Sequence, residues 1–250
     1  MEDKKVIKRN VSSNPHIRAF MSTNHIMLIV AGSLLPALCY GVYHFGYRAL
    51  LVVLSSVLSC MLTEIAFLMI TSKGKSLKEC SSLVTGLLLG LNLPVSSPLW
   101  MPVIGGVFAI GVVKMLFGGL GKNFMNPALA ARCFLLISFP KLMTNFNYDG
   151  LTSATPLQSI RNGELVNLKD MFLGNTAGTI GETCSLAIII GGLALIIIGI
   201  IDFYIPVMYI LTFSLCLLLF AGRGFDYNYL FLELCGGGLM LGAFFMATDY

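Results

Sequence analysis

Long apolar runs dominate the sequence and constrain its fold more than any other feature. Residues 26–43, 49–70, 186–201 and 203–220 approach or exceed the roughly 20 residues that a helix needs to cross a bilayer. The chain is 56% hydrophobic and only 11% charged, so a soluble fold would lack the polar surface to cover its apolar residues. The sequence therefore predicts an all-α polytopic membrane protein.

The spacing of the apolar runs predicts about eight transmembrane helices. Their expected ranges are 25–45, 48–71, 80–97, 99–118, 126–139, 182–201, 203–221 and 228–247. The first 24 residues are basic and contain neither the apolar core nor the cleavage site of a signal peptide. We therefore expect this segment to stay in the cytoplasm of a bacterial cell, below the inner (plasma) membrane.

The distribution of lysines supports this orientation. Lys73, Lys75 and Lys78 follow the second span, and Lys114 and Lys122 flank the loop after the fourth, as the positive-inside rule requires. The chain then divides into a cytoplasmic segment, a first membrane repeat, a long extracytoplasmic loop and a second repeat. These parts are residues 1–24, 25–139, 140–181 and 182–250. The net charge of +4 is explained by topology and does not indicate nucleic acid as a partner.

Two apolar segments contain residues that interrupt helices. Asn92 and Pro94 break the segment from Leu83 to Leu99, and Asn126-Pro127 opens the segment that ends at Phe139. Broken helices at membrane depth are typical of folds built from inverted repeats. Residues 86–98 are echoed weakly by residues 237–250, which indicates such a repeat and predicts that the second repeat lacks its last two spans.

Charged residues within spans are costly and therefore candidates for function. Glu64, Arg132, Glu233 and Asp249 meet this description, and Glu182 stands where it can complement a helix N-terminus. Each is interpreted either as part of an ion pathway or as a member of a buried pair. The seven cysteines and three histidines form no metal-ligand pattern, so we expect no metal site within this chain.

The extracytoplasmic loop contains the heptapeptide Asp149-Gly-Leu-Thr-Ser-Ala-Thr155, followed by Pro156. Its local interpretation is structural: Asp-Gly favours a turn, Thr155 is a good N-cap, and proline suits the first position of a helix. This structural interpretation is sufficient to explain the residue types and spacing of the heptapeptide.

The heptapeptide also resembles the flavinylation motif of the RnfD-type subunits of Rnf ferredoxin:NAD oxidoreductase complexes. The related NqrB-type subunits of sodium-translocating NADH:quinone reductases share it. The segment from Gly118 to Leu129, with its Gly-Lys-Asn-Phe-Met-Asn-Pro-Ala-Leu sequence, is similar to a second family signature, and Gly181-Glu182-Thr183 and residues 246–250 to further ones. The resemblance runs from about residue 25 to the end of the chain. It implies an architecture similar to that of urea channels.

The resemblance implies that Thr155 carries FMN through a phosphoester, within a motif that includes Asp149, Thr152, Ser153 and Ala154. An extracytoplasmic flavin transferase would attach the FMN. The chain would relay electrons between ferredoxin and NAD, coupled to transport of Na+ or H+, without being catalytic alone. The implied partners are a second flavoprotein, iron–sulfur subunits and membrane lipid.

The resemblance further implies a non-covalent riboflavin held by Asn123 and Asn126 near the cytoplasmic side. Side-chain amides can both donate to and accept from a flavin ring. The alternative is that both asparagines only cap the backbone around Pro127.

Two other functions remain open at the level of sequence. The chain could be a B-type subunit of a quinone reductase, whose quinone site would map onto Phe134 and the region of Gly86 and Gly90. It could also be a channel or transporter for a small solute, since such folds use interrupted helices. An exposed Ser-Ala-Thr loop has no role in a solute channel, and this feature favours the electron-transfer interpretation.

Overall fold

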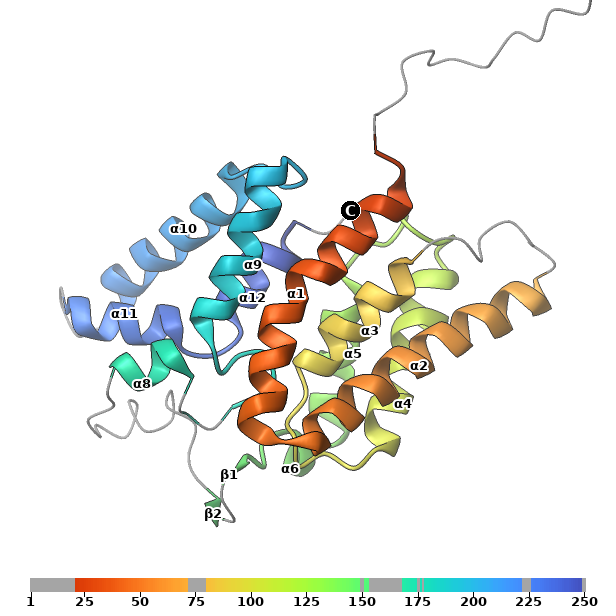
Figure 1. Ribbon diagram of the computed structural model, residues 1–250, viewed down its shortest axis with the longest axis horizontal. Coiled ribbons are helices and arrows are strands. Elements are labelled where there is room, and N and C mark those ends of the chain that lie inside the picture. Colours follow the sequence, from red (N-terminus) through yellow and green to blue (C-terminus); the bar gives the residue numbers. More distant parts are fainter. Residues whose placement is uncertain are drawn as a thin grey trace, which may run out of the picture.

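The computed structural model describes residues 21–71, 80–148, 151–152, 168–174, 176, 178–221 and 226–248. This part of the chain is helical apart from one pair of two-residue strands (Figure 1). In chain order its elements are α1 (Thr23–Phe45), α2 (Tyr47–Ile70), α3 (Ser81–Leu91), α4 (Trp100–Val107), the π-helix η1 (Phe108–Met115), α5 (Pro127–Ser138), α6 (Pro140–Met143), β1 (Asn147–Tyr148), β2 (Leu151–Thr152), α8 (Leu168–Leu173), α9 (Ser185–Ile198), α10 (Tyr204–Phe220), α11 (Tyr227–Cys235), α12 (Leu239–Leu241) and the π-helix η2 (Gly242–Met246).

The apolar helices are those of a membrane protein. Within the described residues, α1 and α2 are long and apolar enough to cross a bilayer, and α11 with α12–η2 makes a third if that bent pair is one span. The other apolar helices, α3, α4–η1, α5, α9 and α10, are shorter. Each of the eight predicted segments thus contains a helix or a bent pair, but length and composition alone qualify only two or three as spans.

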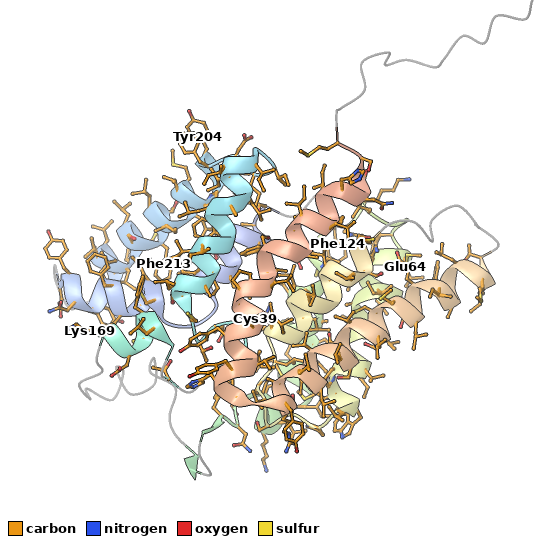
Figure 2. The ribbon with its side chains drawn as sticks, in the orientation of Figure 1. Cys39, Glu64, Phe124, Lys169, Tyr204 and Phe213 are labelled. Atoms are coloured by element: carbon orange, nitrogen blue, oxygen red, sulfur yellow. The ribbon has the colours of Figure 1, made fainter. Side chains whose placement is uncertain are left out.

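Apolar side chains cover the outside of the helices as well as the core. On α10 only Pro206 is buried, and Phe220 at its end is 83% exposed. Figure 2 shows Tyr204, at the start of α10, pointing away from the rest of the fold. An apolar outer surface of this kind is what lipid or a membrane partner covers.

Helix α3 forms the centre of the first half of the fold. It is buried from Ser81 to Leu91 except for Leu83, and it packs against α1, α2 and α5. A Cβ on Gly86 would lie 2.7 Å from the Cα of Val57, and one on Gly90 would lie 2.9 Å from the Cα of Val53. The two glycines, one helical turn apart, therefore allow the backbones of α2 and α3 to approach closely, as small residues do between membrane helices.

The predicted break after α3 is confirmed. The helix ends at Leu91, and Asn92 closes it by donating from Nδ2 to the carbonyl oxygen of Leu88 at 2.7 Å. Pro94 cannot donate a backbone hydrogen bond, and regular helix resumes only at Trp100.

The second interruption lies in the last apolar segment, where α11 and α12–η2 meet at an angle of 66°. The bend occurs at residues 236–238, which are three consecutive glycines. Residues 239–246, which echo the interrupted part of the first repeat, remain helical. This bend is not one of the two interruptions that the sequence predicted, at Asn92 and Pro94 and at Asn126-Pro127, and the three glycines that make it were not used as a signal.

Candidate functional site

Part of the predicted flavinylation motif lies in the strand pair. Strands β1 and β2 are antiparallel, with Asn147 opposite Thr152 and Tyr148 opposite Leu151. Thr152 thus lies in β2. The other motif residues, Asp149, Ser153, Ala154 and Thr155, lie outside the described residues.

Contacts between segments far apart in sequence place the strand pair at one end of the helices. Trp100, at the start of α4, packs edge-to-face on Phe139 at a ring distance of 5.2 Å. The hydroxyl of Ser96 donates to the carbonyl oxygen of Asn145, just before β1. Figure 1 shows β1 and β2 at the opposite end of the helices from the start of α1. We call this end the hairpin end.

A pocket lies at the opposite end, and we call it the asparagine pocket. Its empty space is about 350 Å³, counting the part open to the surroundings. It is formed by the start of α1, the first half of α3, the end of η1 and the loop before α5. The lining residues are Met27, Ser81, Val84, Thr85, Leu88, Lys114, Leu120, Asn123, Asn126 and Pro127. Both asparagines predicted from the sequence are thus in one pocket.

The two asparagines have different surroundings. Asn126 is the N-cap of α5: its Oδ1 accepts from the backbone N–H groups of Ala128 at 2.9 Å and Leu129 at 3.2 Å. The capping interpretation is therefore confirmed for Asn126. The Oδ1 of Asn123 is buried and has no hydrogen-bond partner among the described residues. Capping does not account for Asn123.

The loop that carries Asn123 is shaped by glycines. Gly118, Gly119 and Gly121 have φ values of 110°, 95° and 76°, which side-chain-bearing residues rarely adopt. These glycines let the chain turn between η1 and α5, so that Asn123 reaches the pocket.

Lys114, one of the residues that line the asparagine pocket, belongs to a buried ion pair. The ammonium of Lys114 lies 2.7 Å from Oε1 of Glu64 and donates to Oγ of Ser81 at 2.6 Å. The two charged side chains are 2% and 8% exposed. Glu64 is labelled on α2 in Figure 2. The paired interpretation is confirmed for Glu64, whereas the sequence had placed Lys114 only as a basic residue beside a loop. The missed signal is a lone lysine within an apolar run, which needs a buried partner.

A second ion pair lies where the broken helices meet. Nη1 of Arg132 lies 2.7 Å from Oε1 of Glu182 and donates to Oδ1 of Asn92 at 2.6 Å. The contact with Glu182 is close but lacks hydrogen-bond alignment, so it is an ion pair. A Cβ on Gly238 would lie 2.7 Å from the same Oε1 atom. The pair therefore lies against both helix breaks, and the paired interpretation is confirmed for Arg132.

The segment before α9 and the first residue of α9 connect the two breaks. Gly181 N–H donates to the carbonyl oxygen of Leu91 at 2.8 Å, and Ile180 N–H donates to that of Leu93 at 3.2 Å. Oγ of Ser185 donates to the carbonyl oxygen of Cys235 at 2.9 Å. Carbonyl groups that the breaks would leave unpaired in an apolar environment are thus satisfied.

The other charged candidates are less informative. Glu233, on α11, is 9% exposed, and Asp249 lies outside the described residues. No group of three potential metal ligands occurs among the residues that the structure describes.

The region where a quinone site would map is closely packed. Gly86 and Gly90 face the backbone of α2, as described above, and leave no room there for a ring. Phe134 stacks on Phe108, with ring centroids 4.3 Å apart and planes 9° apart. These three residues are therefore used in helix packing.

Comparison with known proteins gives consistent matches over nearly the whole chain. Residues 10–250 match the family described as NQR2, RnfD, RnfE. One relative is the D-type subunit of the Na(+)-translocating ferredoxin:NAD(+) oxidoreductase complex of Acetobacterium woodii. The chain is 47% identical to it over 249 residues, covering 96% of the chain and 76% of that protein.

Two further relatives are similar over comparable lengths. The D-type subunit of the proton-translocating ferredoxin:NAD(+) oxidoreductase complex of Clostridium ljungdahlii is 36% identical over 264 residues, or 97% of the chain and 80% of that protein. The D-type subunit of the ion-translocating oxidoreductase complex of Shewanella frigidimarina is 32% identical over 286 residues, or 96% of the chain and 81% of that protein.

Proposed function

The chain belongs to the NQR2, RnfD, RnfE family, and from this premise we propose that it is a membrane subunit of an ion-translocating ferredoxin:NAD oxidoreductase complex. In this role it carries FMN on Thr155 and relays electrons within the complex. The bound flavin supplies one-electron redox chemistry, and the protein supplies its position and electrostatic surroundings. The chain is one component of the oxidoreductase and does not catalyse the overall reaction alone.

The position of the strand pair carries the FMN proposal. The motif runs from Asp149 to Thr155, and its Leu151 and Thr152 form β2 at the hairpin end. Just before β1, the hydroxyl of Ser96 holds the backbone at Asn145. A hydroxyl that a transferase must esterify has to be accessible, and a loop at the end of a helix bundle meets that requirement. Asp149, Thr152, Ser153 and Ala154 then form the sequence that the transferase recognises.

The proposed topology follows from the asparagine pocket and the hairpin end, which lie at opposite ends of the helices. With residues 1–24 in the cytoplasm of a bacterial cell, the asparagine pocket lies on the cytoplasmic side of the plasma membrane and the hairpin end lies outside. All eight apolar segments then cross or enter the membrane, in an inverted-repeat architecture similar to that of urea channels. The two breaks that meet at Arg132 and Glu182 support this arrangement.

Riboflavin in the asparagine pocket is the second part of the proposal. The space that a water molecule can reach in this pocket is about 10 Å³, enough for about one water. A flavin ring therefore requires the lining, including the loop that carries Asn123, to move apart. The polar group that the pocket offers is Oδ1 of Asn123, a buried acceptor with no partner among the described residues. Asn126 would act by fixing the start of α5 and, with it, the loop that carries Asn123.

The remaining partners are proposed by analogy. They are a second flavoprotein and iron–sulfur subunits within the complex, and a flavin transferase outside the membrane. The relatives differ in the ion that their names give, Na+ for one and a proton for another, so either ion fits the proposal. The role of a B-type subunit in a quinone reductase is disfavoured by the packing of Gly86 and Gly90 against α2.

In-gel fluorescence tests the FMN proposal. The chain is co-expressed with a flavin transferase, denatured in SDS and examined under ultraviolet light. We expect a fluorescent band that disappears in Thr155→Val. The matched control is Thr144→Val, because Thr144 is near the same end and its hydroxyl donates to the carbonyl oxygen of Pro140 at 2.9 Å. Absence of a band with a transferase that modifies another substrate would refute covalent FMN and favour the solute-channel alternative.

A further inference from the structure

The loop between η1 and α5 exposes apolar side chains at both of its ends. Leu116 and Phe117 follow η1 directly, and Phe124 and Met125 come shortly before α5. All four are exposed, and Phe124, labelled in Figure 2, is 65% exposed. The two phenyl rings contact each other, with centroids 4.8 Å apart. We call these four residues the loop patch. A cluster of exposed apolar side chains outside regular helix indicates a surface that something other than water covers.

The backbone of the loop has a defined conformation. Gly119 N–H donates to the carbonyl oxygen of Lys114 at 3.0 Å, and Lys122 N–H donates to that of Gly119 at 3.2 Å. At the far end of the loop, Oδ1 of Asn126 caps α5. The exposure of the loop patch therefore follows from a hydrogen-bonded structure and not from a lack of structure.

The loop patch continues the apolar outer surface of the two adjacent helices. Leu116 lies four residues after Val112, an exposed residue on η1. Met125 lies four residues before Leu129, an exposed residue on α5. Residues at this spacing lie on nearly the same side of a helical segment. The surface that lipid or a membrane partner covers thus extends from the helices into the loop.

The lengths of these helices favour lipid as the covering. Helices α4 and η1 have eight residues each and are continuous, so at about 1.5 Å per residue they extend roughly 24 Å. Helix α5 has 12 residues and extends roughly 18 Å. The hydrocarbon core of a bilayer is about 30 Å thick, so neither reaches across it. Apolar side chains beyond the helix ends supply the missing apolar length.

Lys122 marks the polar limit of the loop patch. Its side chain is exposed, and a Cβ on Gly118 would lie 3.0 Å from Cδ of Lys122, so the lysine stem folds back along the loop. A stem in this position can lie among apolar groups while its ammonium reaches the phosphates of lipid headgroups. The charge of Lys122 is therefore compatible with a loop that enters the membrane.

We propose that the loop patch is inserted in the membrane, with Phe117 and Phe124 among the acyl chains of the nearer leaflet and the Lys122 ammonium at its phosphates. The loop is then a lipid-binding surface and not a connection that water surrounds. The proposed topology makes this leaflet the cytoplasmic one. The inference does not depend on FMN or riboflavin, because it rests on the outer surface of the helices.

Fluorescence of a single tryptophan tests the insertion. Trp100 is the only tryptophan of the chain, so Phe124→Trp combined with Trp100→Phe places one reporter in the loop patch. The full chain is reconstituted into nanodiscs of phosphatidylcholine, either unmodified or brominated near the headgroup end of one acyl chain. Bromine quenches tryptophan at close contact, and we expect the brominated lipid to lower the emission about twofold. Iodide in the water should have little effect. Phe117→Trp in the same background is the second variant and should behave alike.

Lys122→Glu, added to the Phe124→Trp chain, tests the headgroup contact in nanodiscs that also contain anionic phosphatidylglycerol. A carboxylate is repelled by the lipid phosphates, so the quenching by brominated lipid should weaken. Unchanged quenching would show that Lys122 does not contact the headgroups and would contradict that part of the proposal.

Oxidation of methionine by hydroxyl radicals in water provides a measurement on the unaltered chain. Met125 in the loop patch is 43% exposed, and Met208 on the outside of α10 is 60% exposed. If lipid covers the loop patch, Met125 in nanodiscs should be oxidised no faster than Met208. Faster oxidation of Met125, or a tryptophan at position 124 that iodide quenches and brominated lipid does not, would place the loop patch in water. The proposal would then be wrong, and the loop patch would be open to a soluble partner.

Discussion

The two ion pairs of this protein differ in how fully they are enclosed. Lys114 and Glu64 are 2% and 8% exposed, whereas Arg132 in the second pair is 30% exposed and Glu182 is 9% exposed. The first pair is connected to one further side chain, Ser81, and the second bridges two helix breaks through Asn92 and the backbone near Gly238. The comparison indicates that each charge of the Lys114 pair is stabilised mainly by the opposite charge of its partner. The position of the Arg132 pair is set mainly by the helix breaks that surround it.

Removing Lys114 alone should have the largest effect on stability. Lys114→Met leaves the carboxylate of Glu64 buried and uncompensated, which we expect to lower the free energy of unfolding by about 3–5 kcal/mol. Unfolding of the purified chain in mixed detergent micelles, followed by circular dichroism, measures the change.

The double replacement Lys114→Met with Glu64→Leu serves as the control for this prediction. It should recover most of the lost stability, because no buried charge remains. If both proteins are equally destabilised, packing of the lysine side chain and not charge compensation is the dominant contribution.

Arg132→Met should destabilise the chain by a smaller amount, about 2–3 kcal/mol, because Arg132 is partly exposed and solvent or lipid headgroups can compensate part of the loss. Arg132→Lys keeps the charge but cannot contact Glu182 and Asn92 with the same planar group, so it should recover only part of the stability. Equal stability of the lysine variant and the unaltered chain would show that charge alone, and not the bridging geometry, is required.

The sequence predicted much of this arrangement because its signals are local. Asn92 and Pro94 lie within a few residues of each other and interrupt a helix by themselves, so the first break was predictable. The positions of the eight apolar segments follow from composition. The three consecutive glycines at 236–238 were a similar local signal for the bend between α11 and α12, which was not predicted.

The pairing of Lys114 with Glu64 could not be predicted in the same way. The two residues are 50 positions apart, and only the packing of α2, α3 and η1 brings them together. A basic residue near the end of a span also satisfies the positive-inside rule, which gave Lys114 a sufficient explanation without a partner. The sequence interpretation treated Asn123 and Asn126 alike, although Pro127 directly after Asn126 already indicated which of them is the N-cap.

The close contact of α2 and α3 offers a third test, because these two helices carry Glu64 and Ser81, the partners of Lys114. Gly90→Ala places a Cβ within 2.9 Å of the Cα of Val53, so the helices must separate. We expect a loss of about 1–2 kcal/mol, measured in the same unfolding assay. Gly32→Ala, on α1, is the control, since a Cβ there meets nothing within 4 Å and should cost little. A neutral Gly90→Ala would mean that the interface adjusts freely.

The smallest stability effects separate the two asparagines. Asn126→Ala removes the cap of α5 and should cost about 1 kcal/mol. Asn123→Ala removes a buried acceptor that has no partner among the described residues, so its effect on the ligand-free chain should be close to zero. The same unfolding assay, with and without riboflavin, distinguishes the roles: added riboflavin should stabilise the unaltered chain more than Asn123→Ala. If Asn123→Ala destabilises the ligand-free chain as much as Asn126→Ala, Asn123 is a structural residue. The asparagine pocket would then lose the acceptor on which its proposed ligand depends.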